Sequence, residues 1–172
     1  VFALISMNDM AAPSVSLEGK SLWLAHSLPV TAWQVLRAKL RMHLLLTAVP
    51  GAVLGVCLVA VCGFPAVQMA AVLALAAVFL VFSALMNLFL GLKMPNLHWT
   101  SEITPIKQSG AVAIALLGGW AYAAAMAALY FLVGRHMGFA AYMAGFLALT
   151  LAAAVLLYIW VRKKGCAIFA SL

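Results

Sequence analysis

Polar side chains that could do chemistry are few in this chain and far apart. The histidines are His26, His43, His98 and His136, and the acids are Asp9, Glu18 and Glu102. A metal site on a helix needs ligands at close spacing such as i, i+4, and no histidine pair has it. A hydrolase or acyltransferase needs a nucleophile clustered with a base. We expect no metal, cofactor or catalytic site and interpret the histidines as interfacial polar residues.

Two further short patterns fail as functional motifs. Gly19-Lys20-Ser21 has the ending of a phosphate-binding loop, but the glycine required five positions earlier is replaced by Ser14. The three cysteines, of which Cys57 and Cys62 share an apolar run, lack paired metal-ligand spacing. Because Ser14 replaces that glycine, we expect no ATP-binding motif in the chain itself.

Composition places the chain in the lipid bilayer. It is 68% hydrophobic and 8% charged with a mean hydropathy of +1.18, whereas soluble domains are about a quarter charged. Such a chain is predicted to be an integral membrane protein. The net charge of +7 does not indicate nucleic acid, because the basic residues stand at the ends of apolar runs.

Four apolar runs are long enough to cross a bilayer as helices, since a crossing takes about 20 residues. They cover residues 42–62, 66–92, 110–133 and 139–161. We predict an all-helical, multi-pass membrane bundle, with residues 1–12 as the end of an earlier membrane helix. Tight turns at 63–65 and 134–138 predict antiparallel hairpins, residues 93–109 form a loop, and residues 162–172 form a tail. Pro50 predicts a kink in the first span.

Lysine and arginine positions predict the orientation. Nine of the basic residues precede the first span, lie in the 93–109 loop or follow the last span, and only Arg135 lies on the other side. The positive-inside rule then makes residues 13–41, the 93–109 loop and the tail cytoplasmic.

Polar and aromatic residues of the spans add two expectations. The central parts of the spans carry no charge, and Asn87 and Gln68 are the main polar amides. This argues against a proton- or sodium-coupled transporter, which usually needs intramembrane acids. Trp99, Tyr158 and Trp160 stand near span ends, as in an interfacial aromatic belt.

Small residues repeat at helical spacing in two spans. Gly51 and Gly55 form one such pair, and Ala111, Ala115 and Gly119 form a longer series. Small residues four apart let helix backbones approach closely in lipid. The pattern predicts either a dimer seam or packing inside one bundle.

The polar segment 13–41 is predicted to hold two helices. Ser16 is a candidate N-cap with Glu18 in the first turn, and Pro29 stops the helix near Leu28. The expected amphipathic helix therefore covers 16–28. Thr31 with Gln34 forms a capping box for a second, basic helix that runs into the first span.

The polar segment resembles the coupling region of type-2 ABC transporter permeases, and is most similar to a bacterial group of exporter permeases. The resemblance rests on Glu18-Gly19-Lys20-Ser21-Leu22-Trp23, Ser27-Leu28-Pro29-Val30, and Lys39-Leu40. In that family a cytoplasmic coupling helix between the second and third spans fits a groove on the ATP-binding subunit. The resemblance implies that the contacts to the ATPase are Glu18, Gly19, Lys20, Trp23, Leu28 and Pro29.

The loop Pro95-Asn96-Leu97-His98-Trp99 … Glu102 … Lys107-Gln108-Ser109 also looks like that group. It implies a second cytoplasmic contact at Glu102, Lys107 and Gln108. The family's half-unit has six spans, so this chain would hold the end of the second through the sixth. The implied protein sits in the bacterial inner membrane and works as a homodimer or beside another permease half.

Two other functions stay open at this point. A membrane scaffold or assembly subunit would use the polar segment to bind a protein without dependence on ATP. A membrane-embedded enzyme would lose activity on changing His98 or Glu102 while the polar segment stays dispensable. The substrate of an exporter would remain open among lipids, peptides and drugs.

Overall fold

A computed structural model describes residues 2–19, 27–63, 65–97, 99, 101, 103–107 and 109–172. This part of the chain is helical and contains no strand. Among these residues four helices are long and apolar enough to cross a membrane: Ala32–Leu58, Ala66–Lys93, Gly110–Gly134 and Phe139–Ser171. The prediction of an all-helical bundle with four long apolar helices is confirmed.

The helices follow one another in a simple order along the chain. They are α1 (Phe2–Ile5), α2 (Ala11–Leu17), α4 (Ala32–Cys62), α5 (Ala66–Lys93), α6 (Ile103–Lys107), α7 (Gly110–Leu129), the π-helical η1 (Tyr130–Gly134), α8 (Arg135–Met137), α9 (Phe139–Trp160), the π-helical η2 (Val161–Gly165) and α10 (Cys166–Ser171).

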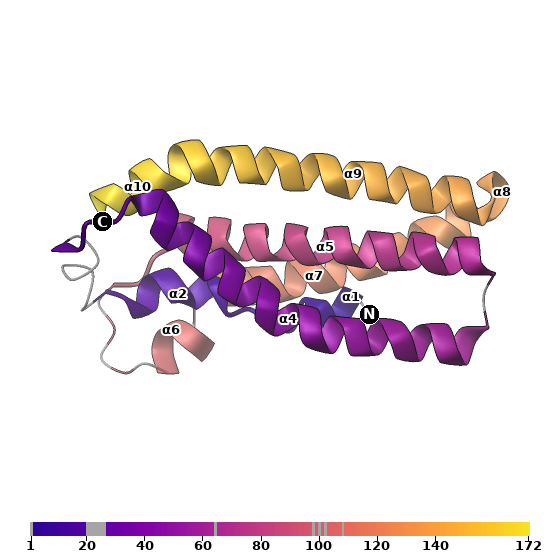
Figure 1. The fold of residues 1–172 in the computed structure, drawn as a ribbon, viewed down its shortest axis with the longest axis horizontal. Helices are drawn as coiled ribbons and strands as arrows, with labels where there is room; N and C mark the ends of the chain where they lie inside the picture. The colour runs from indigo at the N-terminus through magenta and orange to yellow at the C-terminus, as the bar shows by residue number, and fades with distance from the viewer. Residues whose placement is uncertain are drawn as a thin grey trace.

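Helix α5 is the centre of the bundle, and it contacts α4, α7, α9 and α2. Figure 1 shows α2, α6, α10 and the start of α4 at one end of the molecule and α8 at the other. Helix α4 begins beside α10 and crosses the bundle obliquely before it runs along α5 (Figure 1). The largest buried cluster joins these elements at the α10 end, where Leu36 of α4, Leu88 of α5 and Phe169 of α10 are buried together.

Helix α4 begins at the predicted cap. The Gln34 backbone N–H donates to Thr31 Oγ1 at 3.3 Å, and the Thr31 N–H donates to Gln34 Oε1 at 2.8 Å, so the capping box is confirmed. The basic helix and the first span are one continuous helix as far as Cys62. Pro50 lies inside α4, which bends midway along its length (Figure 1).

The predicted helix start at Ser16 is wrong. Helix α2 begins at Ala11 and ends at Leu17, with Glu18 as its C-cap, not in a first turn. Burial of Ala11, Ala12 and Val15 extends the helix upstream, and the Ser16 hydroxyl accepts a bond from a distant loop instead of capping a helix. The predicted boundary between residues 12 and 13 falls inside α2, and residues 20–26 lie outside the described chain.

The predicted turn at 134–138 is shorter than expected. The chain stays helical through η1 and α8 and turns only at Gly138, whose φ of 82° is a left-handed value that suits glycine. Gly134 is buried against Tyr130 and Tyr142. Side chains of α7 and α9 then meet, since Tyr122 and Thr150 share a hydrogen bond of 2.6 Å.

The small residues of the spans pack inside the bundle. A Cβ on Gly55 would lie 2.9 Å from Leu73 of α5, and one on Gly119 would clash with the Ser6 side chain. Ala111 and Ala115 are buried beside Ala12 of α2. Of the two readings of this pattern, the structure supports packing within one bundle.

Candidate partner-binding surface at the basic end of the bundle

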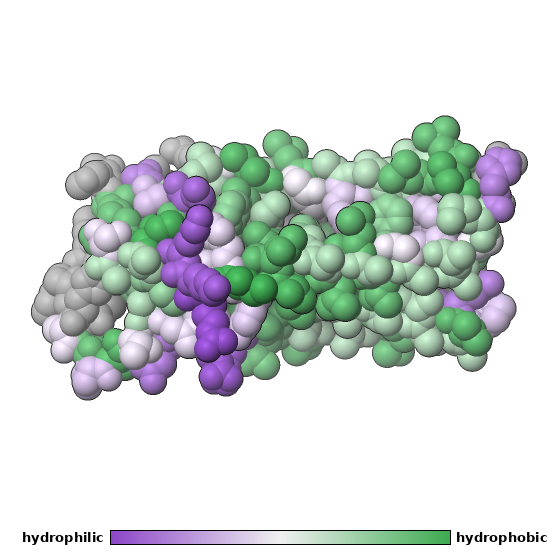
Figure 2. Space-filling view, turned by 90° about the horizontal axis from the view of Figure 1, so that it is seen from above, coloured by the Kyte–Doolittle hydropathy of each residue, from purple (hydrophilic) through white to green (hydrophobic). Residues whose placement is uncertain are grey.

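Exposed basic side chains collect at the α2, α6 and α10 end of the bundle. They are Arg37, Arg41, Lys93, Arg162, Lys163 and Lys164. Figure 2 shows hydrophilic residues as a band near one end of an otherwise apolar surface, with a smaller polar group at the far end. Arg135 belongs to α8 at that opposite end (Figure 1). The basic residues that the sequence analysis assigns to one side of the membrane therefore lie at one end of the bundle, and Arg135 lies at the other.

Two segments that are far apart in sequence interlock at the basic end. The Asn96 N–H donates to Ser16 Oγ at 3.0 Å, and Trp99 Nε1 donates to the Ser16 carbonyl at 2.7 Å. A Cβ on Gly19 would lie only 2.8 Å from the carbonyl oxygen of Leu97, so glycine permits this approach. We call residues 16–19, together with residues 95–97 and Trp99, the interlocked segments.

Trp99 has a different role from the one expected. The sequence suggests an interfacial aromatic, but the side chain is only 9% exposed and its ring nitrogen is bonded within the protein. Tyr158, by contrast, is 40% exposed at the end of α9, where the expected belt would lie. Trp99 therefore stabilises the interlocked segments, because its indole N–H satisfies a carbonyl at the end of α2.

Lys39 ties the end of α2 to α4. Its Nζ lies 2.7 Å from Glu18 Oε1 and donates to the Ser14 carbonyl at 2.8 Å. The lysine side chain is 10% exposed and that of Glu18 is 31% exposed. Glu18 Oε2 is buried and has no hydrogen-bond partner. Glu18 is therefore engaged within the chain, and its role at this surface is to hold the end of α2 in place.

Apolar side chains are exposed beside these segments and outside the four candidate spans. Leu28 is 51% exposed and Val30 is 44% exposed, with Pro29 exposed between them. On α6, Ile103 and Ile106 are exposed as well. Apolar side chains set among polar ones at the end of a bundle are typical of a protein contact.

The sequence-based contact residues divide into four groups. Glu18 and Gly19 lie in the interlocked segments, while Leu28 and Pro29 lie on the exposed apolar stretch. Lys107 ends α6, and nothing is described of its side chain. The others, Lys20, Trp23, Glu102 and Gln108, lie outside the described residues.

Sequence reasoning missed a polar cluster at the break between α1 and α2. Asn8 Nδ2 donates to Thr47 Oγ1 at 2.6 Å, and the Ala11 N–H donates to His43 Nδ1 at 3.3 Å. His43 is 1% exposed, so its interpretation as an interfacial residue is wrong. The adjacent polar pair Asn8-Asp9 in an apolar stretch was the available signal.

Asp9 completes this cluster on the side of α5. Its carboxyl lies beside the side-chain amide of Asn87, and Asp9 belongs to the α1–α2 break, outside the four candidate spans. Burial raises the pKa of Asp9 to about 6, and the Asn87 side chain opposes part of that rise. The carboxyl therefore keeps its proton to a higher pH than an exposed aspartate does.

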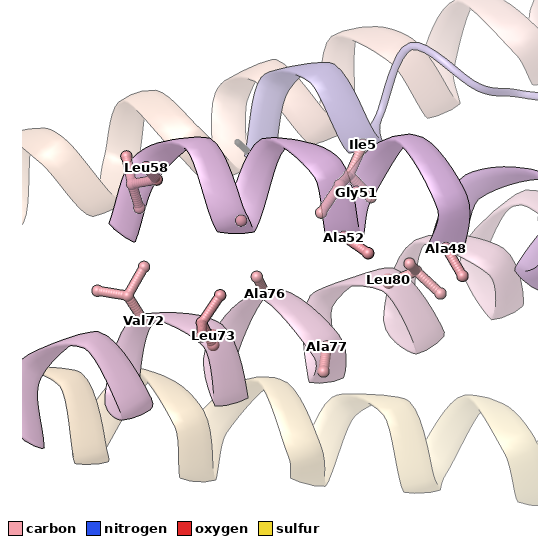
Figure 3. Close-up of a pocket in the computed structure, with 11 residues that line it drawn as sticks. Ile5, Ala48, Gly51, Ala52, Leu58, Val72, Leu73, Ala76, Ala77 and Leu80 are labelled. Atoms are coloured by element: carbon pink, nitrogen blue, oxygen red, sulfur yellow. The ribbon is translucent and has the colours of Figure 1, made fainter. Parts of the chain in front are cut away.

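A cavity of about 220 Å³ lined by apolar side chains lies between α4 and α5. Figure 3 shows Gly51, Ala52 and Leu58 of α4 facing Val72, Leu73 and Ala76 of α5, with Ile5 of α1 at its side. The lining offers no polar side chain to a ligand, so it suits an apolar group such as an acyl chain or a side chain.

Within the described ranges no three His, Cys, Asp or Glu side chains come together as a metal site. Cys57 is exposed and Cys166 is half-buried, and both are free thiols. No protein-family model, curated protein or solved structure matches the chain.

Proposed function

We propose that the chain is a membrane-spanning permease subunit of an ATP-driven ABC exporter. The observation that carries this proposal is the bonding of Ser16 to Asn96 and Trp99. It unites at one end of the bundle the two segments in which the family resemblance lies. A partner that binds there meets a single surface joined to two of the long helices.

Motion at this surface would pass into the spans by short, specific contacts. The Lys39–Glu18 ion pair connects the end of α2 to α4. The loop residues Asn96 and Trp99 follow directly from the end of α5 and are bonded to Ser16. ATP-driven movement of the partner would therefore displace α4 and α5 together, and the bundle would alternate between inward-open and outward-open arrangements.

The contact residues have two roles in this proposal. Leu28 and Pro29, exposed at the basic end, make the apolar contact with the ATPase, together with Lys20 and Trp23 of the same segment. Glu18 and Gly19 position that contact, since one is paired with Lys39 and the other packs on Leu97. Residues Glu102, Lys107 and Gln108, around α6, form a second contact.

The distribution of lysine and arginine supports the proposed orientation of the subunit in the membrane. Exposed lysines and arginines follow or precede the spans at the end that carries the interlocked segments. Positive charge in short loops favours the cytoplasm, so this end lies on the cytoplasmic side of a bacterial inner membrane, where the ATPase binds. The opposite end, with α8 and Gly138, faces outward.

The exposed face of α7 is where we place the contact with a second permease half, which is either another copy or part of a longer chain. Among the four candidate spans it is the least buried, with 6% of its most apolar stretch buried within the described bundle. Ile114, Leu117 and Trp120 are all exposed along it. A face of this kind contacts lipid or a neighbouring helix bundle.

Site-directed photo-crosslinking in native membranes tests the proposal. A photoreactive residue at Leu28 is compared with one at Met137, which has a similar exposed fraction at the opposite end of the bundle: 51% against 60%. We expect Leu28 to crosslink to a protein with a phosphate-binding loop and Met137 not to do so. Crosslinking of Leu28 to lipid alone would contradict the proposal.

A further inference from the structure

A cavity of about 490 Å³ lies between the α1–α2 break, α2, α6 and α7. Its volume is more than twice that of the apolar cavity between α4 and α5, which is about 220 Å³. Figure 1 shows α2 and α6 at the same end of the bundle, and the lining residues Val112 and Leu116 lie near the start of α7. The cavity is therefore at the basic end of the bundle, and it has the size of sites that bind small organic molecules.

Most of the cavity lining is apolar and adaptable. Met7 and Met10 border the cavity from the break, Leu17 from α2 and Ile106 from α6. Methionine side chains are flexible and polarisable, so they fit apolar groups of different shapes. Met7 is 58% exposed and Met10 is 53% exposed, so much of their surface is open to a ligand. These walls suit the apolar body of a small molecule.

The two polar side chains of the lining, Asp9 and Asn8, are both left as acceptors. Asn8 Nδ2 donates to Thr47 Oγ1 at 2.6 Å, so the oxygen of this amide remains to accept a bond. Asp9 Oδ1 is buried and has no hydrogen-bond partner. Such a lining favours a ligand that brings a positive charge, and it offers no strong donor to an anion.

No described side chain neutralises the Asp9 carboxylate. Among the residues that the structure describes, the one ion pair is Lys39–Glu18, and no Lys, Arg or His lines the cavity. A partly buried carboxylate without a positive partner is unfavourable, because it loses hydration and gains no attraction in return. A cation in the cavity would supply that attraction where water screens it less than at the surface.

We propose that this cavity binds a hydrophobic cation, with its apolar body between the methionines and α7 and its positive nitrogen beside the Asp9 carboxylate. Sequence reasoning missed the site because Asp9 lies before the first span and the lining comes from separate segments. In the proposed exporter, a cationic substrate would enter here from the cytoplasmic side. That last step rests on the proposed function, whereas binding of the cation does not.

Two molecules of the same shape test the role of charge. Benzyltrimethylammonium is a permanent cation, and neopentylbenzene has a carbon in place of its nitrogen. Asp9 is the one aspartate in the sequence, so the full chain is labelled with aspartate enriched in carbon-13 at the carboxyl and observed by NMR in micelles of an uncharged detergent. At pH ~8 this carboxyl, whose pKa burial raises to about 6, is ionised. We expect the cation to shift the Asp9 signal with saturation and the neutral molecule to shift it less.

Equal shifts by the two molecules, or no shift with the cation, would overturn the proposal. Phosphatidylcholine carries the same quaternary nitrogen beside a phosphate, for which the lining has no strong donor, so it should leave the signal in place. A saturable shift with this lipid would show that a headgroup occupies the site and would overturn the choice of a free cation.

Asp9→Asn keeps the shape of the side chain and removes its charge. It should weaken binding of radiolabelled benzyltrimethylammonium, measured by equilibrium dialysis, by about tenfold or more, because removal of one member of a partly buried charge pair is costly. The variant should remain folded, since an amide is buried at lower cost than an ionised carboxyl. Equal affinity of the two proteins would contradict the proposal.

Charge placed at the edge of the cavity tests where the cation lies. Ile106 lines the cavity and is 44% exposed, whereas Ile103 of the same helix is 60% exposed and does not line it. Ile106→Lys should weaken binding of the cation and Ile106→Glu should strengthen it, each by about two- to fivefold. The same changes at Ile103 should have smaller effects. Equal effects at the two positions, or none at either, would overturn the proposal. The purified chain is used without an ATPase, so these outcomes are independent of the proposed function.

Discussion

Lys39 Nζ lies 2.7 Å from Glu18 Oε1, and this pair fixes the end of α2 against the first turns of α4. The same ammonium donates to the carbonyl of Ser14 at 2.8 Å, one turn from the C-terminus of α2. A cation at this position also suits the negative end of a helix. The contact lies beside the surface proposed to bind an ATPase, so it is both a structural tie and a route for motion.

A double-mutant cycle measures the strength of this pair. Lys39→Met should destabilise the folded protein by about 1–3 kcal/mol, because it leaves a partly buried carboxylate and a carbonyl without their donor. Glu18→Gln should cost less, since Lys39 keeps Ser14. Together they should cost less than the sum of the two, as measured by denaturant unfolding in detergent micelles. Additive effects would show that the two side chains do not interact.

Trp99→Phe should loosen the loop that joins α5 to α6. The change keeps most of the ring but removes the N–H that bonds to the Ser16 carbonyl, at a cost of about 1–1.5 kcal/mol. Limited proteolysis should cut this loop faster in the variant. Trp120→Phe is the matched control, because Trp120 is 48% exposed on α7, and it should leave the rate unchanged. Equal rates in all three proteins would contradict the interlocked arrangement.

Gly91→Ala tests the close approach of α2 to α5. A Cβ at this position would clash with the carbonyl oxygen of Ala12, so the two helices would have to separate at a cost of about 1–3 kcal/mol or more. Gly145→Ala is the control, because no atom lies within 4 Å of a Cβ there. It should be neutral or stabilise α9 slightly, by up to about 1 kcal/mol. A lower melting temperature for Gly145→Ala than for Gly91→Ala would contradict this packing.

The stability of the protein should fall as the pH rises through about 6. Asp9 binds its proton more tightly in the folded state, where its pKa is raised to about 6, than in the unfolded state. A raised pKa of this kind contributes stability that is complete below pH ~4 and is lost as the pH passes the folded value. Asp9→Asn removes the titration, so its melting temperature should exceed that of the wild type at pH ~8 and approach it at pH ~5. The opposite order at pH ~8 would refute the direction of the shift.

Local patterns were enough to predict the long helices. The spans around 66–92 and 139–161 end within a few residues of the observed helices, because uninterrupted apolar runs leave the backbone one way to bond in lipid. The Thr31–Gln34 capping box was also predictable, since both partners stand within one turn.

Contacts between distant segments were not predictable in the same way. Ser16 has the residue type of an N-cap, yet it bonds to residues 80 and 83 positions away. In the sequence Gly91 is one of many small residues of a span, although Ala12 of α2 packs directly against it. The buried cluster around Asp9 depends on three separate elements that meet only in the folded bundle. The spacing of residues along the sequence does not predict contacts between distant segments. These long-range contacts form the candidate site.

The most direct test of the central claim is a purification of the full-length protein from its native membrane. The wild type is compared with Leu28→Asp and with Met137→Asp, which changes a similarly exposed apolar residue at the opposite end. The account predicts that an ATPase with a phosphate-binding loop accompanies the wild type and Met137→Asp but is lost from Leu28→Asp. Recovery of all three proteins without any ATPase would contradict the account.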